Sequence, residues 1–265
     1  VILIMGGFMR ALITGASSGI GYQVGKKLAL EGHLVYMTCR SVREVFHLRK
    51  KLEKEGVHAI CFKMDLTSDD INIVDHLDID CLFNHAGCGT AGSILSMDEN
   101  SLRDIYEVNL FRSFLLLKKV YQHMVDKKIT GKIFVTSSLA SMYPFPFLGV
   151  YTSSKAAISQ LVKTLQRESR VFGNSVCFCL VEPGAYATGF NQAMIDKVEL
   201  YQELNDKFLS IHNYQRKLFS LLESRNIDKI ANKIVKEVVK EKPKKILRIP
   251  WVQGIFLKIH AFFFL

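Results

Sequence analysis

The sequence predicts an α/β fold: one domain built on a doubly wound parallel sheet of about seven strands, with helices on both faces. Short apolar runs alternate with longer helical segments, which is the pattern of parallel βαβ units. The strand-like runs are continuously apolar, as expected for strands covered on both faces. The chain has 265 residues, of which 49% are hydrophobic, and this is enough for the core of one large domain.

The first half of the chain contains four of the predicted strands. They cover Arg10–Thr14, His33–Arg40, His58–Met64 and Ile79–Phe83. Amphipathic helices are predicted after the first strand up to about Leu30, over Ser41–Gly56, and from about Glu99 to Lys127. Because each helix links strands that follow one another in the sequence, these strands are expected to run parallel.

The second half continues this alternation and then departs from it. Further strands are predicted at Lys132–Ser137, Ser175–Val181 and Lys245–Ile249, and helices at Tyr151–Phe172 and Ile227–Val239. One or two substrate-loop helices are expected within about 190–224. The predicted domain therefore covers residues 9–249, and residues 250–265 form an apolar C-terminal tail.

The formal net charge of +10 favours anionic partners. A phosphorylated cofactor, an acidic membrane surface or a nucleic acid would all fit. No nucleic-acid motif accompanies the Lys and Arg residues, which are spread along the chain with some enrichment in 236–248. We therefore expect no nucleic-acid partner.

The cysteines indicate a reducing compartment. The chain has six, mostly in strand-like runs, and none forms Cys-x-x-Cys, so we predict no metal site and expect small core residues. Free cysteines are typical of the cytoplasm. The apolar start has no basic leader and is too short for a signal peptide, and Met9 is an alternative start.

A glycine-rich turn joins the first predicted strand to the first helix, with the sequence Gly15-Ala-Ser-Ser-Gly19-Ile-Gly21. Glycines let the backbone turn tightly and approach a ligand, and a helix N-terminus offers amides and positive charge to a pyrophosphate. Such a sequence can be an ordinary turn, but between an apolar strand and a helix it indicates a dinucleotide site. The expected contacts are Gly15, Ser17, Ser18, Gly19, Ile20 and Gly21.

The end of the second strand indicates which dinucleotide is bound. An acidic residue there would bind the ribose 2′-hydroxyl and repel a 2′-phosphate. Here the strand ends in Thr38-Cys39-Arg40, with Arg43 one turn further on, and a guanidinium suits phosphate. The alternative is a solvated arginine at a strand end. We expect NADP(H) in preference to NAD(H), with Arg40 as the contact.

The segment Tyr151-Thr-Ser-Ser-Lys155 offers acid/base chemistry. In a helix these two side chains project from one face, and an ammonium beside a phenol lowers a phenol pKa that is normally about 10. That would make proton transfer available at cellular pH. Ser138 can hydrogen-bond the same substrate oxygen. The spacing alone is weak evidence, because Tyr22 and Lys26 repeat it on what we expect to be ordinary helix surface.

Five motifs, taken together and in order, resemble those of the short-chain dehydrogenases/reductases, a family with a single Rossmann-type domain. The resemblance covers residues 9–249. The motifs are Thr14-Gly-Ala-Ser-Ser-Gly-Ile-Gly21, Asp65-Leu66, Asn84-His-Ala-Gly87, Ser138 with Tyr151-x-x-x-Lys155, and Pro183-Gly184-x-x-x-Thr188. Val108-Asn109-Leu110 supplies the family's asparagine. Each motif is weak alone, but their order is specific.

By that resemblance, the catalytic residues are Asn109, Ser138, Tyr151 and Lys155. Tyr151 is the acid/base, and Ser138 orients the substrate oxygen. Ser138 lies thirteen residues before Tyr151, as the family's serine does, and Ser137 does not. Lys155 binds the nicotinamide ribose and lowers the tyrosine pKa. Asn109 holds a water that relays protons to Lys155.

The resemblance also implies the cofactor contacts. Asp65 would touch the adenine, Asn84 the adenosine side, and Thr188 the nicotinamide carboxamide. The remaining implied contacts are Leu66, Ala86, Gly87, Pro183 and Gly184, together with Tyr151 and Lys155. His85 stands where the family usually has a second asparagine, and we expect it to be a packed or hydrogen-bonded histidine.

The resemblance implies an NADP(H)-dependent interconversion of a carbonyl and a secondary alcohol, and reduction is the favoured direction. The implied assembly is a homodimer or homotetramer. Apolar residues near the site predict a hydrophobic, steroid-like or lipid-like substrate; they are Met142 to Leu148, Phe190 and Met194. Core or subunit interface is the alternative account of them. Two other functions stay open: a 3-ketoacyl-thioester reductase, and a non-catalytic NADPH-binding regulatory or scaffold protein.

The tail, residues 251–265, is apolar apart from Gln253, Lys258 and His260. It is shorter than the roughly 20 residues that span a bilayer as a helix, but it can lie at a membrane interface. The basic segment Lys240–Arg248 would add attraction to anionic lipid. We therefore expect a cytoplasmic protein with peripheral membrane contact. The alternative is that the tail packs over the substrate pocket or a partner subunit.

Overall fold

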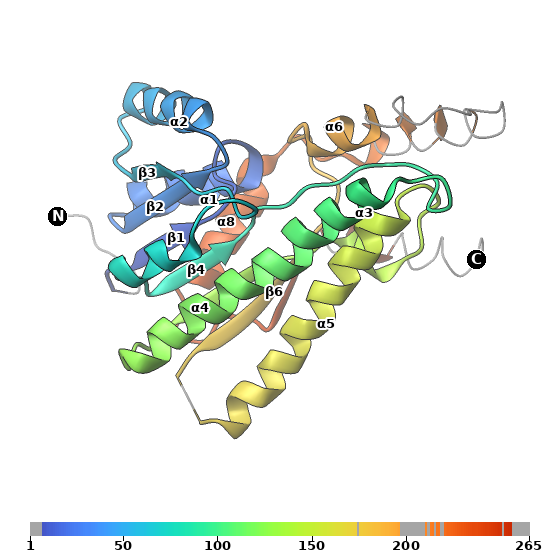
Figure 1. Cartoon of the computed structure of the whole chain (residues 1–265). Coiled ribbons are helices and arrows are strands. Elements are labelled where there is room, and N and C mark those ends of the chain that lie inside the picture. Colours follow the sequence, from blue (N-terminus) through green and yellow to red (C-terminus); the bar gives the residue numbers. More distant parts are fainter. Residues whose placement is uncertain are drawn as a thin grey trace.

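The centre of the fold is a seven-stranded parallel sheet (Figure 1). The computed structural model describes residues 7–173, 175–196, 210, 213–214, 216–217, 220–250 and 252–255. The strands are β1 (Arg10–Ile13), β2 (Leu34–Cys39), β3 (Ile60–Lys63), β4 (Cys81–Asn84), β5 (Lys132–Thr136), β6 (Cys177–Pro183) and β7 (Ile246–Ile249). Their order is β3-β2-β1-β4-β5-β6-β7. The direction of winding reverses between β1 and β4, so the ligand crevice is expected beyond the carboxyl ends of these two strands.

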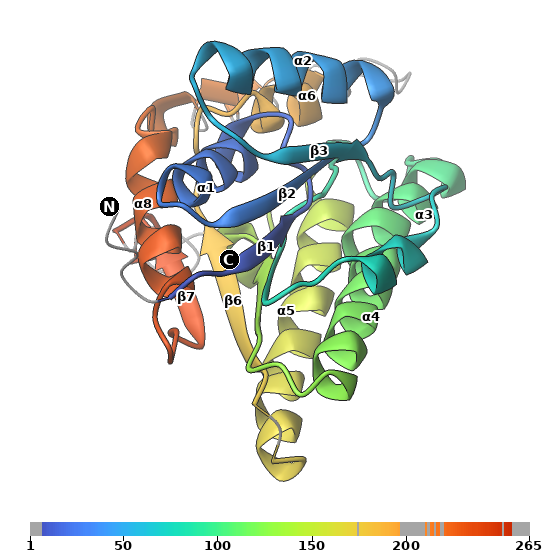
Figure 2. The ribbon, with the colours of Figure 1, turned by 90° about the vertical axis from the view of Figure 1, so that its left-hand side faces the viewer.

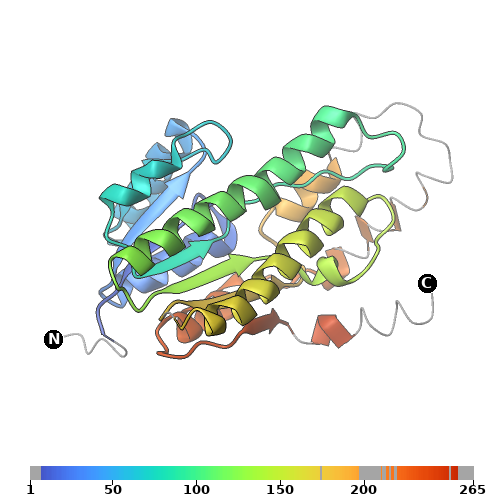
Figure 3. The same cartoon turned by 60° about the horizontal axis from the view of Figure 1, so that its bottom comes forward.

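Helices cover both faces of the sheet (Figure 2 and Figure 3). One face carries α1 (Gly19–Leu30), α2 (Val42–Lys54) and α8 (Ile227–Val238). The other carries α4 (Ser113–Asp126) and α5 (Gly149–Val171), with α3 (Glu99–Tyr106) packed against α5. The remaining described elements are α6 (Phe190–Asp196) and the short 3-10 helices η1 (Ile71–His76) and η3 (Leu139–Met142). The predicted doubly wound fold is confirmed.

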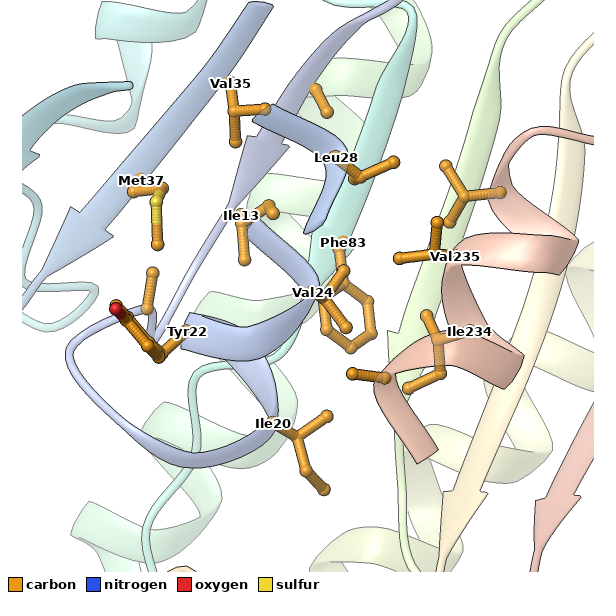
Figure 4. Close-up of a cluster of buried hydrophobic side chains, with 14 of the residues drawn as sticks. Ile13, Ile20, Tyr22, Val24, Leu28, Val35, Met37, Phe83, Ile234 and Val235 are labelled. Atoms are coloured by element: carbon orange, nitrogen blue, oxygen red, sulfur yellow. The ribbon is translucent and has the colours of Figure 1, made fainter. Parts of the chain in front are cut away.

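Alternation along each strand divides the core into two layers. In β1, Ile13 packs among the side chains of α1 and α8, whereas Leu12 packs on the side of α4 and α5. Figure 4 shows the first layer, in which Met37 of β2 and Phe83 of β4 face Val24 and Leu28 of α1 and Ile234 and Val235 of α8. A Lys27–Asp228 ion pair of 2.6 Å joins α1 to α8. Each strand is apolar on both sides because helices cover both faces of the sheet.

The structure corrects two of the predicted elements. The helix expected from Glu99 to Lys127 is interrupted by a π-helical stretch, η2 (Glu107–Arg112), in which the buried side chain of Asn109 makes tertiary hydrogen bonds. Tyr22 is 2% exposed and lies in the core of Figure 4, not on the helix surface, because α2 covers it and places the Lys51 ammonium 3.6 Å from its ring centre.

Two further expectations are met only in part by the described residues. Of the substrate-loop region, α6 is described together with residues 210, 213–214, 216–217 and 220–224; the others lie outside the described residues. Within the described part, no helix has the length and apolar character needed to cross a bilayer. Of the tail, residues 252–255 are helical, and residues 251 and 256–265 lie outside the described set.

Candidate active site

The glycine-rich turn after β1 is tied to the turn after β4 by one side chain. The Thr14 hydroxyl accepts the backbone N–H groups of His85 and Ala86, each at 2.9 Å. Gly15 has φ of 65°, and a Cβ built there would lie 2.9 Å from the Cα of Ala86. The left-handed backbone and the close approach both require glycine. Two of the predicted motifs are therefore one structural unit.

The N-terminus of α1 is available to an anionic ligand. Ser18, its N-cap residue, makes no side-chain hydrogen bond to the helix, and no acidic residue occupies the first turn. The first amides of a helix need partners and favour negative charge. A Cβ on Gly21 would lie 2.5 Å from the carbonyl oxygen of Gly15, so the turn keeps its shape only with glycine there. These features fit the pyrophosphate of a dinucleotide.

The loop after β6 contacts the glycine-rich turn. A Cβ built on Gly19 would lie 3.1 Å from the Cβ of Thr188, which puts the Pro183-to-Thr188 motif beside the glycine-rich turn. The Gly184 N–H donates to the carbonyl of Ile249 at 2.7 Å, anchoring this loop to the end of β7. Both chain segments therefore border the crevice beyond β1 and β4.

The residues predicted to contact the adenosine side of the cofactor differ in their exposure and hydrogen bonding. Arg40 is exposed just beyond β2, whereas Asn84 is buried and donates to the carbonyl and hydroxyl of Ser113 at 2.8 and 2.9 Å. A contact from Asn84 to a ligand would therefore come from its backbone. Asp65 accepts from the Thr67 hydroxyl at 2.7 Å. Arg112, which sequence reasoning missed, donates to the Leu66 carbonyl and so ties this loop to η2.

Ser138, Tyr151 and Lys155 converge at the start of α5. Ser138 follows β5, and its Oγ accepts the Ala140 N–H at 3.1 Å, which leaves its own proton to donate. Ser138 and Tyr151 line the same cavity, and the Ser138 hydroxyl acts to lower the pKa of the phenol. Ser137 points elsewhere: it donates to the Lys155 carbonyl at 2.9 Å and accepts from Ser159 at 2.6 Å. The serine predicted to face the substrate is thus the one beside the tyrosine.

The pKa of the tyrosine differs from the sequence-based expectation. Burial raises the pKa of Tyr151 to about 12, and the hydrogen bond from Ser138 lowers it only in part. Burial also lowers the pKa of Lys155 to about 8. The Lys155 ammonium donates to the Thr136 carbonyl at 3.3 Å. Tyr151 is therefore a protonated phenol near neutral pH, and it is ready to act as a proton donor.

Asn109 joins the catalytic helix to the turn after β4. Its amide exchanges two hydrogen bonds with the backbone of Cys88, at 2.9 and 2.8 Å, and donates to the Ser154 hydroxyl at 3.0 Å. A Cβ on Gly87 would lie 3.1 Å from both Asn109 Oδ1 and Lys155 Nζ. The predicted cofactor turn and two predicted catalytic residues are therefore in direct contact.

His85 is a packed, hydrogen-bonded residue, as expected. Its ring stacks on Phe83 at 5.0 Å between centroids, and its Nδ1 lies 3.0 Å from the Thr136 hydroxyl. Burial and the nearby Lys155 charge lower its pKa to about 3, so the imidazole is neutral. Thr136 thus contacts both His85 and Lys155, and this link is not visible in the sequence.

A cavity of ≈ 50 Å³ lies at Ser138 and Tyr151, the predicted catalytic pair. Ser138 and Tyr151 line it, and most of its other walls are apolar. Of the predicted pocket residues, Phe145, Leu148 and Met194 line it, and Phe190 packs on the Tyr151 ring at 5.8 Å. The wall residues that sequence reasoning missed are Leu139, Ala140, Ala185, Asn191, Leu222 and Gln253. Gln253 shows that the start of the tail reaches the pocket.

Lys155 is expected to destabilise the fold at neutral pH. Its folded pKa of about 8 lies below the roughly 10.4 of an unfolded lysine, so the unfolded chain binds more protons between these values. The free energy of unfolding should therefore rise with pH across this window. Lys155→Met should raise the melting temperature at pH 7, and the advantage should shrink by pH 10.5. Thermal unfolding of both proteins at several pH values measures this; a pH-independent difference would contradict it.

The chain is similar to proteins of known description. The family model described as short chain dehydrogenase matches residues 9–199. The chain is 30% identical over 172 residues to the NADPH-dependent 1-acyldihydroxyacetone phosphate reductase of Saccharomyces cerevisiae, covering 61% of this chain and 56% of that protein. It is 30% identical over 253 residues to the 3-ketodihydrosphingosine reductase of Bacteroides thetaiotaomicron, covering 93% and 90%. It thus spans little more than half of the first relative and most of the second.

A solved structure shares the fold. The short-chain dehydrogenase/reductase from Burkholderia phymatum in complex with NAD superposes with a TM-score of 0.81 at 20% identity, covering 97% of this chain and 94% of that one. At this identity the likeness is one of fold.

Proposed function

Because the chain belongs to the short-chain dehydrogenase family, we propose that it is an NADP(H)-dependent reductase of hydrophobic ketones, interconverting them with secondary alcohols. The observation that carries the proposal is the arrangement of three side chains. Ser138 and Tyr151 line one cavity, and Lys155, one helical turn after Tyr151, lies beside Gly87 of the predicted cofactor turn. A carbonyl in the cavity would meet two hydroxyl donors.

The chemistry of these residues favours reduction. A bound nicotinamide would supply the hydride. Tyr151, a protonated phenol at neutral pH, gives its proton to the carbonyl oxygen as negative charge develops there. Ser138 donates a hydrogen bond to the same oxygen. Lys155 and Asn109 lie beside Gly87 of the predicted cofactor turn, where they would position the nicotinamide ribose and supply the replacement proton.

The cofactor preference rests on Arg40. The uncapped α1 terminus and the glycine-rich turn fit either dinucleotide, since both contain the pyrophosphate. Arg40 is exposed beyond β2, where a 2′-phosphate would lie. The end of this strand, Thr38-Cys39-Arg40, contains no carboxylate that would repel the phosphate. The relative in Saccharomyces cerevisiae is described as NADPH-dependent. These features support NADP(H).

The substrate class follows from the walls of the cavity. Seven of its lining side chains are apolar: Leu139, Ala140, Phe145, Leu148, Ala185, Met194 and Leu222. Both relatives described above have names that refer to lipid-like substrates. We therefore favour lipid-like or steroid-like ketones. The test is NADPH oxidation across ketosteroids, long-chain keto lipids, aromatic ketones, ketoacyl thioesters and sugars, and preferential turnover of the thioesters or sugars would refute this substrate class.

We also propose that the tail contacts membranes. Lys242, Lys244 and Lys245 are exposed just before β7, and the sequence of residues 256–265 contains only two residues that are not apolar, Lys258 and His260. We expect the full chain to co-sediment with anionic vesicles in low salt through basic attraction and apolar insertion. A chain ending at Ile255, which keeps Gln253, should stay in the supernatant.

The same experiment separates membrane binding from assembly. Phe111, Leu115 and Leu161 are exposed apolar side chains on η2, α4 and α5, and they support a homodimer or homotetramer. If the full chain stays in the supernatant and only the shortened chain loses its oligomeric state in light scattering, the tail belongs to a subunit interface. Equal sedimentation of both chains would place the membrane contact elsewhere.

A further inference from the structure

The amide of Gln253 joins two other segments at the wall of the cavity. Its Oε1 accepts the Ala185 N–H at 2.9 Å, and its Nε2 donates to the Leu222 carbonyl at 2.6 Å. Ala185 follows β6, Leu222 precedes α8, and Gln253 follows β7. All three residues line the cavity that also contains Tyr151. A single side chain therefore connects three parts of the chain at the substrate end of the site.

Gly184 makes this approach of Gln253 possible. A Cβ built on Gly184 would lie 1.8 Å from Gln253 Oε1, so any larger residue would displace the amide. The segment containing Leu222 is also joined to the same loop by backbone bonds, with Ser224 N–H donating to the Ala185 carbonyl at 3.0 Å. The side-chain amide extends this backbone pairing to the start of the tail.

The cavity is small, so the hydrogen bonds of Gln253 in its wall bear on the size of the substrate. At ≈ 50 Å³ it is well below the roughly 300 to 1,000 Å³ of typical ligand pockets, so a lipid-like ketone needs a wall to move. Ser138 and Tyr151 are held by β5 and α5. Leu222 and Gln253 lie outside the sheet, and the two hydrogen bonds of the Gln253 amide hold them in place.

We propose that Gln253 is a specificity-determining residue: its amide holds Leu222 against the loop after β6 and thereby limits the length of the apolar chain that a ketone can carry beyond the catalytic pair. The inference rests on the proposed ketone reductase activity. It assigns to Gln253 the selection of substrate size, and the chemical step stays with Ser138, Tyr151 and Lys155. Short ketones fit the closed wall, and longer ones require the amide to release its two partners.

Gln253→Met tests the inference, because methionine has a similar length and fills the wall but cannot form either hydrogen bond. The probes are aryl alkyl ketones of increasing chain length. We expect the ratio of kcat/KM for the longest ketone to that for the shortest to rise about tenfold, the scale of two net hydrogen bonds, through a lower KM for the long ketones. Gln192→Met on α6, an exposed position outside the lining, should leave the ratio unchanged.

Hydrogen exchange provides a readout that needs no substrate. The Ala185 N–H should exchange at least several times faster in Gln253→Met than in the parent protein or in Gln192→Met. Unchanged exchange, or an unchanged size ratio in an active enzyme, would overturn the proposal. If the parent protein reduces no ketone but Ala185 loses protection in Gln253→Met, the proposed function fails and the structural connection holds.

Discussion

Tyr151→Phe is expected to lower kcat for ketone reduction by at least ~100-fold, the usual scale for a general acid. The substitution removes only the transferable proton and keeps the ring that packs against Phe190 and the wall of the cavity. Binding of NADPH, followed by fluorescence titration, should be nearly unchanged. Steady-state turnover of the best ketone from the panel measures the loss.

The second Tyr-x-x-x-Lys copy provides a matched control. Tyr22→Phe makes the same change at a residue that is 2% exposed in the α1 core, away from the cavity, and should leave turnover near the parental rate. Turnover by Tyr151→Phe at half the parental rate would rule out the acid/base role. If the parent protein binds NADPH but turns over no carbonyl in the panel, the regulatory or scaffold alternative becomes the better account.

Arg40→Asp is expected to weaken NADPH binding by about 10- to 100-fold, which is the scale of one charge-assisted hydrogen bond. The guanidinium that would bind the 2′-phosphate is lost and a carboxylate that repels it is gained, while NADH, which has no phosphate there, should bind as well as before or better. Arg40 is exposed, so the new carboxylate is not buried. Dissociation constants for both dinucleotides measure the change.

Arg43→Asp controls for the overall change in surface charge. Arg43 is also exposed, on the first turn of α2, and its replacement alters the net charge by the same amount. It should reduce NADPH affinity less than Arg40→Asp does. The reverse ranking would move the determinant to Arg43, and equal small losses would indicate general electrostatic attraction without a specific contact.

Local sequence patterns were sufficient to predict most of the fold and the glycine-rich turn. The apolar strands and their alternation with helices predicted the parallel sheet, because burial on both faces leaves a continuous apolar run. The glycine-rich turn was predictable because a left-handed backbone at Gly15 and the close approach at Gly21 need glycine whatever surrounds them. Ser138 was separated from Ser137 by the family resemblance, in which the serine lies thirteen residues before the tyrosine. In the structure the Ser137 hydroxyl is bound to the Lys155 carbonyl and to Ser159.

Other features depend on contacts between distant segments. The π-helical stretch at Asn109 cannot be inferred from an amphipathic pattern, because it accompanies hydrogen bonds to Cys88 and Ser154. The raised pKa of Tyr151 results from burial by surrounding side chains, an effect that outweighs the opposing influence of Ser138. Tyr22 is buried because α2 packs over it, and no spacing along α1 encodes that contact.

The sequence by itself determined the parallel α/β fold, the glycine-rich turn and the absence of a carboxylate at the end of the second strand, since each follows from local periodicity, turn chemistry or charge. The candidate residues of the catalytic helix came from the order of the family motifs, because the spacing of Tyr151 and Lys155 is weak evidence alone. Tertiary structure alone decided which residues close the substrate cavity. Leu222 and Gln253 lie 31 residues apart, and neither belongs to a recognisable motif. They meet because β6 and β7 bring Gly184 and Ile249 together at one edge of the sheet. The order of the strands decides this pairing, and neither segment's own sequence predicts the strand order.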